Sequence, residues 1–112
     1  MSTCIFCRIA AGELGTEFLL SDAQVVAFRD LHPQAPVHAL VIPRQHCTSL
    51  NDAPDAAVLG RVLTAAREVA AQLGIAESGY RVVLNTGPHG GQSVFHLHAH
   101  VLGGRPLGWP PG

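Results

Sequence analysis

The sequence predicts an α+β domain in which a mostly antiparallel sheet of about five strands carries one long helix and a short N-terminal helix. Three observations support this prediction. Short apolar runs bounded by turn residues recur along the chain, as in strands. A longer stretch repeats apolar residues every three or four positions, as in an amphipathic helix. The 112 residues, 47% of them hydrophobic, suffice for one domain with its own core, and residues 1–112 are assigned to it.

The first half of the chain contains the short helix and three of the strands. Glycine and proline mark most of the boundaries, because glycine readily ends a helix and proline cannot continue a strand ladder. In chain order, the predicted elements are a helix over Cys4–Ala11 ended by Gly12, strands over Glu17–Ser21 and Gln24–Phe28 with Asp22 at the turn, and, after the proline-rich loop 31–36, a buried strand over His38–Pro43.

The long helix is predicted from Asp55 to Leu73. Either Asn51 or Asp52 is expected to cap its start, Pro54 fits its first turn, and Gly74 fits the position just past its end. Apolar residues at helical spacing form the side that faces the core, and they are Val58, Leu59, Val62, Leu63, Ala66, Val69, Ala70 and Leu73.

Two further strands follow, over Tyr80–Asn85 and Val94–Leu102, with a turn over Thr86–Ser93. The second strand contains three histidines at alternate positions. Because side chains alternate between the faces of a strand, the histidines share one face and the residues between them face the core. Histidine serves proton transfer, metal ligation and covalent capture of a transferred group, and the spacing alone leaves these open. The row consists of His96, His98 and His100, alternating with Leu97, Ala99 and Val101.

Composition argues against several classes of protein. The formal net charge of −1 disfavours an electrostatic nucleic-acid binder. All seven basic residues are arginine, which excludes chemistry through a lysine Schiff base. The chain has no apolar run of about 18 residues for a membrane span, and its N-terminus lacks a signal-peptide pattern, so a cytoplasmic location is expected. Three cysteines, an odd number, suit a reducing compartment better than a disulfide framework.

The segment before the histidine row has the features of an anion-binding loop. Gly90 and Gly91 let the backbone approach a ligand and point successive N–H groups toward it. Ser93 precedes His96 by three residues, so its hydroxyl is expected to reach a phosphate oxygen or a leaving group. Together, the glycine loop and the histidines indicate a phosphate held next to a nucleophile.

The string HLHAHVL at residues 96–102 resembles the signature of the histidine-triad (HIT) superfamily, in which three histidines alternate with hydrophobic residues. The segments CIFCRIAAGE, VVAFRDLHPQAPVHALVIPRQH, GYRVVLNTG and GGQSVFHLHAHVLGGR are similar to that family in order and spacing. The ending WPPG is similar to its Hint branch, the histidine-triad nucleotide-binding proteins. The resemblance implies a HIT-like fold, a homodimer, and hydrolysis of the P–N bond of purine nucleoside 5′-phosphoramidates without a catalytic metal.

The resemblance also implies a role for each matching residue. His98 would attack the α-phosphorus and form a nucleotidyl-histidine intermediate, which water then hydrolyses. His100 would hydrogen-bond the phosphate, Ser93 would contact the phosphate or the leaving group, and His38 would support the triad. The other implied contacts are Asp30 with the ribose hydroxyls, Asn85 and the backbone of Gly91 and Ser93 with the α-phosphate, Phe6, Ile9 and Phe28 with the base, and Trp109 with the active site of the partner subunit.

The run Cys4-Ile5-Phe6-Cys7 is a C-x-x-C motif, which by itself fits a redox pair, half of a zinc site or a coincidence. No thioredoxin-like βαβ pattern surrounds it, which weakens the redox interpretation. The resemblance implies a structural zinc held by four residues, all present here: Cys4, Cys7, His46 and His96. On this interpretation His96 belongs to the metal site, while Cys47 is a buried neighbour without an assigned role.

Two other functions stay open. One is a dinucleotide polyphosphate hydrolase, as in the Fhit branch, which the WPPG ending and the short chain disfavour. The other is a zinc-stabilised nucleotide-binding adaptor module with incidental turnover. Departures from many relatives concern substrate preference more than the reaction, and neither the physiological substrate nor a choice between adenine and guanine follows from the sequence. These departures are Leu14-Gly15, His32, and His89 in an expected exposed turn.

Overall fold

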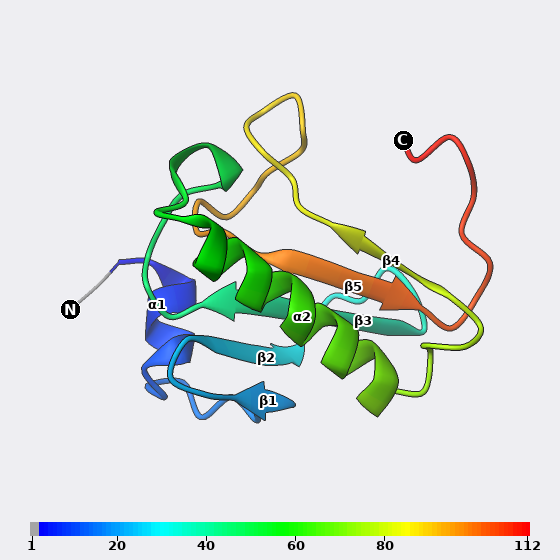
Figure 1. Cartoon of the computed structure of the whole chain (residues 1–112), viewed down its shortest axis with the longest axis horizontal. Coiled ribbons are helices and arrows are strands. Elements are labelled where there is room, and N and C mark those ends of the chain that lie inside the picture. The colour runs from blue at the N-terminus through cyan, green and yellow to red at the C-terminus, as the bar shows by residue number, and fades with distance from the viewer. Residues whose placement is uncertain (1–2) are drawn as a thin grey trace.

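The structure, a computed structural model, describes residues 3–112 and confirms the predicted α+β class. Five antiparallel strands form one sheet in the order β1-β2-β3-β5-β4, and the long helix α2 lies across one of its faces (Figure 1). Within residues 3–112, no helix is long and apolar enough to cross a membrane. The elements are α1 (Ile5–Ala10), β1 (Leu20–Ser21), β2 (Val25–Arg29), β3 (Val37–Pro43), the 3₁₀ helix η1 (Leu50–Asp52), α2 (Ala56–Gln72), β4 (Tyr80–Val83) and β5 (Ala99–Gly103).

Two apolar clusters occupy the two faces of the sheet. Along β2, Val25 and Ala27 pack beneath α2, whereas Val26 and Phe28 pack with Phe6 of α1 on the other face. This division follows from the two-residue period of a strand. Because α1 has only six residues, it covers much less of its face than the 17-residue α2 covers of the other. The α1 face therefore has room for a ligand pocket.

The start of α2 differs from the prediction. Asp55 is the N-cap, and its Oδ1 accepts a hydrogen bond from the Val58 N–H at 2.9 Å. The predicted caps, Asn51 and Asp52, instead lie in η1, where Asp52 forms a capping box with Ser49. The sequence placed Pro54 in the first turn, but it lies before the helix, because the N-cap is Asp55, the residue that follows it. The other end is confirmed: Gly74 has a φ of 77°, which a residue past a helix end adopts readily only as glycine.

The histidine strand is shorter than predicted, and the assignment of 94–98 to it was wrong. β5 begins at Ala99, which pairs with Val41 of β3, and the pairing with β4 begins at His100. Upstream of these pairs the chain leaves the sheet, and the Leu97 N–H donates to the Cys47 carbonyl oxygen at 2.8 Å. The apolar pattern suggested a strand because residues 96–99 are buried whether or not they are paired. The strands predicted over 17–21 and 80–85 are also shorter, at two and four residues.

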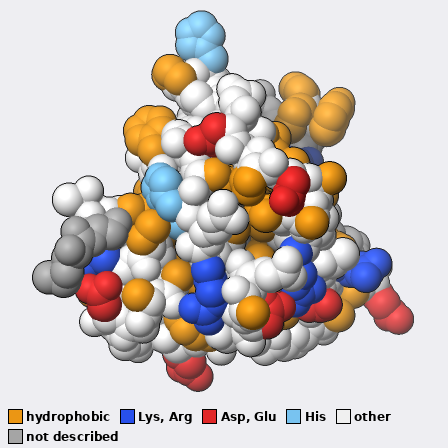
Figure 2. All heavy atoms as spheres, turned by 60° about the vertical axis from the view of Figure 1, so that its left-hand side comes forward, with side chains coloured by type: hydrophobic (Ala, Val, Ile, Leu, Met, Phe, Trp, Pro, Cys, Tyr) orange, Lys and Arg blue, Asp and Glu red, His pale blue; other side chains and the backbone are white. Residues whose placement is uncertain are grey.

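Acidic and basic side chains are interspersed on the side of the molecule drawn in Figure 2. Among the described residues visible there, no basic group extends into a continuous positive surface. Any anionic ligand is therefore expected to be recognised inside a pocket and not by a charged surface on this side.

Candidate active site and metal centre

A pocket of about 870 Å³ opens on the α1 face of the sheet. One part of its wall is apolar and includes Phe6 and Ile9 from α1 and Phe28 from β2. Another part carries polar groups from β3, β5 and the segments next to them. Eight of the predicted catalytic and substrate-binding residues line it: Phe6, Ile9, Phe28, Asp30, His38, Ser93, His98 and His100.

His98 is held in an orientation that suits a nucleophile. Its Nδ1 lies 2.7 Å from the His96 carbonyl oxygen, and a carbonyl accepts only from an N–H. The ring hydrogen of neutral His98 is therefore on Nδ1, and Nε2 keeps a bare lone pair. His98 is 5% exposed, and its ring packs nearly perpendicular to the Phe6 ring, with centroids 5.0 Å apart. The hydrogen bond at Nδ1 thus fixes the orientation of the ring and leaves Nε2 as the atom that can attack a ligand in the pocket.

Two neutral imidazoles lie beside His98. His38 Nε2 is 2.9 Å from His100 Nδ1 and 3.4 Å from Asp30 Oδ2. Burial, with smaller contributions from the His98 and His38 rings, lowers the pKa of His100 to about 4. Burial also lowers the pKa of His38, and the Asp30 carboxylate offsets part of this effect. Neither ring carries a positive charge near pH 7, so they contact an anion as hydrogen-bonding groups and not as cations.

Asp30, His38 and His100 are close enough together to suggest a metal site, but the hydrogen bonding opposes one. The Gln34 N–H donates to His38 Nδ1 at 3.0 Å. The hydrogen of the neutral ring must then be on Nε2, the nitrogen that faces the other two residues. A metal needs a bare nitrogen there. These three residues are therefore better explained as a hydrogen-bonded group.

The four predicted zinc ligands converge on a second cluster. Their donor atoms are separated by 3.3 Å from Cys4 Sγ to His96 Nδ1, 3.4 Å from Cys7 Sγ to His46 Nδ1, and 3.2 Å between the two Nδ1 atoms. A tetrahedral zinc with sulfur at about 2.3 Å and nitrogen at about 2.0–2.1 Å would space its ligand atoms by about 3.3–3.8 Å. Two thiolates and two imidazoles also match the ligand chemistry that zinc prefers.

His96 presents the correct nitrogen to this cluster. Its Nε2 lies 2.8 Å from the Pro43 carbonyl oxygen and must donate to it, which leaves Nδ1 bare toward the sulfur atoms. The ring is fully buried, and burial lowers its pKa, so it is neutral as a ligand must be. The residues present therefore fit a zinc ion. His96 thus joins the two sites, because its ring belongs to the cysteine–histidine cluster and its carbonyl oxygen fixes His98.

Gln92 holds the glycine loop in place, a role that the sequence did not reveal. Its side chain is buried, and Oε1 accepts from the Gly87 N–H at 3.0 Å. Its Nε2 donates to the carbonyl oxygens of Thr48 at 2.6 Å and Val94 at 3.1 Å. These bonds connect the loop to the segment that carries His46. The only sequence signal was the position of a glutamine next to the paired glycines.

Three predicted binding residues lie outside the pocket lining described for this chain. Asn85 is half-buried just after β4. Gly91 is exposed in the turn, with a φ of 80°. Trp109 is 82% exposed in the C-terminal segment, which Arg81 holds through a 2.6 Å bond to the Gly108 carbonyl oxygen. Their assignments stay predictions.

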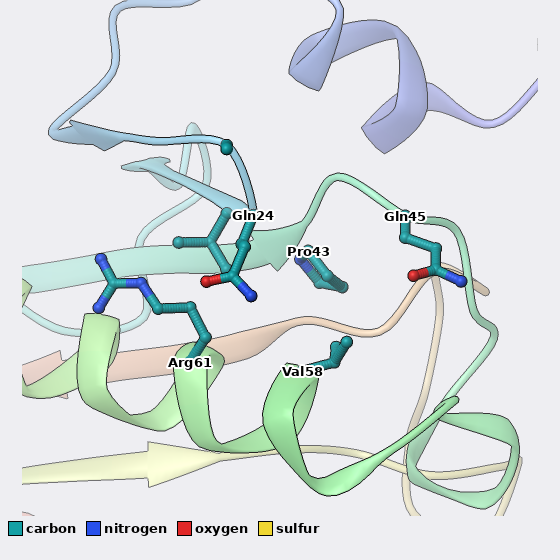
Figure 3. Close-up of a pocket in the computed structure, with 7 residues that line it drawn as sticks. Gln24, Pro43, Gln45, Val58 and Arg61 are labelled. Carbon is teal, nitrogen blue, oxygen red and sulfur yellow. The ribbon is translucent and has the colours of Figure 1, made fainter.

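A smaller hollow of about 140 Å³ lies between the start of α2 and the sheet (Figure 3). Gln24 lies near the sheet side of this hollow, and Arg61 and Val58 project from α2. The Arg61 guanidinium is engaged by Asp22 at 2.8 Å and Glu68 at 3.2 Å. Because this cation is already neutralised, the hollow offers no clear means of binding an anion.

Comparison with known proteins agrees with this geometry. The family model described as the HIT domain matches residues 11–107. The purine nucleoside phosphoramidase of Escherichia coli strain K12 is 49% identical over 106 residues, which cover 93% of this chain and 89% of that protein. A HIT family hydrolase from Legionella pneumophila superposes with a TM-score of 0.93 at 45% identity, covering 98% of this chain and all of that one. The histidine triad nucleotide-binding protein of Candida albicans has a TM-score of 0.84 at 32% identity, covering 96% and 83%.

Proposed function

This chain belongs to the HIT domain family, and on that premise we propose that it is a purine nucleoside phosphoramidase that works through a nucleotidyl-histidine intermediate on His98. The observation that carries the proposal is the bare Nε2 of His98 in the pocket, fixed by the bond from Nδ1 to the His96 carbonyl oxygen. The name of the E. coli relative supplies the substrate class.

The reaction would proceed in two displacements at the α-phosphorus. In the first, the Nε2 lone pair of His98 forms a bond to phosphorus while the P–N bond breaks and its electron pair leaves with the nitrogen. The amine takes a proton that solvent water supplies through the Ser93 hydroxyl. In the second, water attacks the phosphorus and gives a proton back to solvent while the bond from phosphorus to His98 Nε2 breaks, which releases the nucleoside monophosphate and neutral His98. His100, Asn85 and the backbone of Gly91 and Ser93 would hold the phosphate oxygens, where donated hydrogen bonds stabilise developing charge.

The remaining pocket residues would hold the nucleoside. Asp30 would accept hydrogen bonds from the ribose hydroxyls, a common use of a carboxylate in nucleotide sites. Phe6, Ile9 and Phe28 would wall the base, and their apolar side chains line the pocket. His38 would support His100 from behind, in agreement with the 2.9 Å contact between their rings.

The experiment is intact-protein mass spectrometry after brief mixing with adenosine 5′-phosphoramidate, paired with steady-state release of AMP. The expected result is an adduct of one nucleotidyl group on the wild-type chain and neither adduct nor turnover for His98→Ala. Diadenosine triphosphate serves as the comparison substrate and is expected to be hydrolysed more slowly. Retained turnover in His98→Ala would show that His98 is not the nucleophile. Faster hydrolysis of diadenosine triphosphate would show that the substrate class is a dinucleotide polyphosphate and not a phosphoramidate.

We further propose that Cys4, Cys7, His46 and His96 hold a structural zinc. The spacing of their donor atoms and the bare Nδ1 of His96 support this proposal. In this position zinc would tie α1 to the sheet and would not itself contact the substrate. Metal analysis of protein purified without added zinc tests it, with about one zinc per chain expected.

We also propose that the protein forms a homodimer in which Trp109 reaches the partner's pocket. Trp109 is 82% exposed on a segment that Arg81 holds near β4, an edge strand of the sheet. A large exposed aromatic side chain on an anchored segment is typical of a contact surface. Light scattering coupled to size-exclusion chromatography measures the mass directly.

A further inference from the structure

The loop between β2 and β3 controls where the hydrogen of a buried imidazole lies. The Gln34 main-chain N–H points at His38 Nδ1 from 3.0 Å. An N–H bonds only to a bare nitrogen, so the hydrogen of the neutral His38 ring is on Nε2. His38 is 6% exposed, which makes an unsatisfied alternative costly because no bulk water is available to replace the bond.

This placement determines the tautomer of the next ring. His38 Nε2 lies 2.9 Å from His100 Nδ1, a shorter contact than the 3.4 Å to Asp30 Oδ2. Because Nε2 carries the hydrogen, His100 Nδ1 is the acceptor, and the hydrogen of His100 is on its own Nε2. His100 lines the pocket with its ring centroid 4.9 Å from that of His98. His100 thus presents a hydrogen-bond donor, its Nε2–H, to the pocket beside the bare Nε2 of His98.

The opposite pair of tautomers would impair the site. A hydrogen on His38 Nδ1 would face the Gln34 N–H, donor against donor. His38 Nε2 would then be bare and would accept from a hydrogen on His100 Nδ1. His100 would in turn present a lone pair to the pocket, where it would repel an anionic oxygen. The main-chain N–H of Gln34 therefore decides, through the His38 ring, whether His100 presents a hydrogen-bond donor or an acceptor to the pocket.

Gln34 is itself held by a residue from another part of the chain. The Arg105 guanidinium donates through Nη2 to the Gln34 carbonyl oxygen at 3.0 Å. Gly104 brings this part of the chain against the loop, since a Cβ at Gly104 would lie 2.9 Å from Pro36 Cβ. Within the loop, the Gln34 side chain donates to the His32 carbonyl oxygen at 2.9 Å. The amide is thus fixed from both sides.

We propose that Gln34, through its main-chain N–H, and Arg105, through the Gln34 carbonyl oxygen, are positioning residues that set the tautomers of His38 and His100 so that His100 donates a hydrogen bond into the pocket. This inference rests on the proposed function only where it identifies the acceptor as a phosphate oxygen of the nucleotide. The tautomers themselves are a property of the ligand-free protein.

Nuclear magnetic resonance of ¹⁵N-histidine-labelled protein tests the proposal, because the ring-nitrogen shift distinguishes a nitrogen that carries hydrogen from a bare one. The wild type is expected to show hydrogen on Nε2 of both His38 and His100. Gln34→Pro removes the N–H, and its His38 signals are expected to move toward a mixture of tautomers. Gln34→Ala keeps the N–H and loses only the side-chain bond to the His32 carbonyl oxygen, so its tautomers are expected to stay much closer to wild type than those of Gln34→Pro. Hydrogen on His38 Nδ1 in the wild type would overturn the proposal.

Arg105→Met provides a second test that leaves the loop sequence unchanged. It is expected to move the His38 signals partway toward the mixture and to lower kcat by about tenfold with a smaller change in KM, and Arg105→Lys should recover part of both. A misplaced imidazole hydrogen costs up to about 10⁴-fold in kcat in other enzymes. Arg67→Met, on the exposed side of α2, is the matched control.

The two proposals can fail separately. Unchanged His38 and His100 signals in both Gln34→Pro and Arg105→Met would refute the positioning role, whatever the activity. If the wild type shows the expected tautomers but does not release AMP from the phosphoramidate, the proposed function fails and the tautomer assignment stands.

Discussion

Replacing Gln92 by methionine is expected to destabilise the protein and to slow its reaction. The substitution nearly conserves volume but removes three hydrogen bonds, to the Gly87 N–H and to the carbonyl oxygens of Thr48 and Val94. At about 0.5–1.5 kcal/mol for each bond, the free energy of unfolding should fall by about 1.5–4.5 kcal/mol. The Gln92 side chain is buried, whereas Gly87, Thr48 and Val94 are half-buried, so we expect a loss near the middle of this range, about 3 kcal/mol.

Urea unfolding of zinc-saturated protein measures this effect. With an m value of about 1–3 kcal/mol per molar urea, the midpoint should fall by roughly 1 M or more. Gln72→Met, at the exposed end of α2, is the matched control and should shift the midpoint only slightly. Phosphoramidase activity should fall as well, because the loop that Gln92 holds leads directly into Ser93. A midpoint within about 0.2 M of wild type, which corresponds to about 0.6 kcal/mol at most, would refute the view that these bonds hold the loop.

Three further predictions follow from the site. Cys7→Ser should abolish stoichiometric zinc binding and lower the melting temperature, measured by metal analysis and differential scanning fluorimetry; full zinc content in this variant would contradict the ligand assignment. Because the pKa of His100 is about 4 in the fold against 6.5 for an ordinary histidine, the unfolded chain binds more protons between these values. The free energy of unfolding should therefore fall as pH falls from about 6.5 toward 4, with His100 contributing up to about 1.4 kcal/mol per pH unit. Urea unfolding at pH 5 and pH 7 measures this loss, and an equal or higher midpoint at pH 5 would contradict the prediction. Trp109→Ala should raise KM and leave the chain folded by circular dichroism, and an unchanged KM would separate Trp109 from the nucleotide site.

The sequence predicted the elements whose signals are local. The helix α2 follows from apolar residues spaced at the helical repeat. Its end follows from Gly74, because glycine readily adopts the positive φ found past a helix end. The predicted caps, Asn51 or Asp52, were wrong because Asp55 can accept the same hydrogen bond, and asparagine and aspartate cap helices about equally well. Their difference arises from the 3₁₀ turn at Leu50–Asp52, which consumes the first two candidates.

The path of residues 94–98 could not be predicted from the sequence, for a different reason. A strand exists only where another strand pairs with it, and β3 and β4 stop pairing with β5 at Ala99 and His100. The groups that then fix His96 and Leu97 are the main-chain carbonyls of Pro43 and Cys47, which carry no signal in a sequence. For the same reason, the contact of the Gln34 N–H with His38 was not predictable, although His38 itself was.

The cluster of Cys4, Cys7, His46 and His96 shares the helix α1 with the pocket, so a metal bound there would also affect catalysis. Cys4 caps α1 and Cys7 lies within it, while Phe6 between them walls the pocket and packs against the rings of both His96 and His98. A metal at this cluster would hold the helix from one side and the His96 ring from the other. Because the His96 carbonyl oxygen orients His98, removing the metal would loosen both the base wall and the nucleophile. Chelation should therefore raise KM and lower kcat together, whereas a metal that served folding alone would reduce only the fraction of active protein and leave KM unchanged.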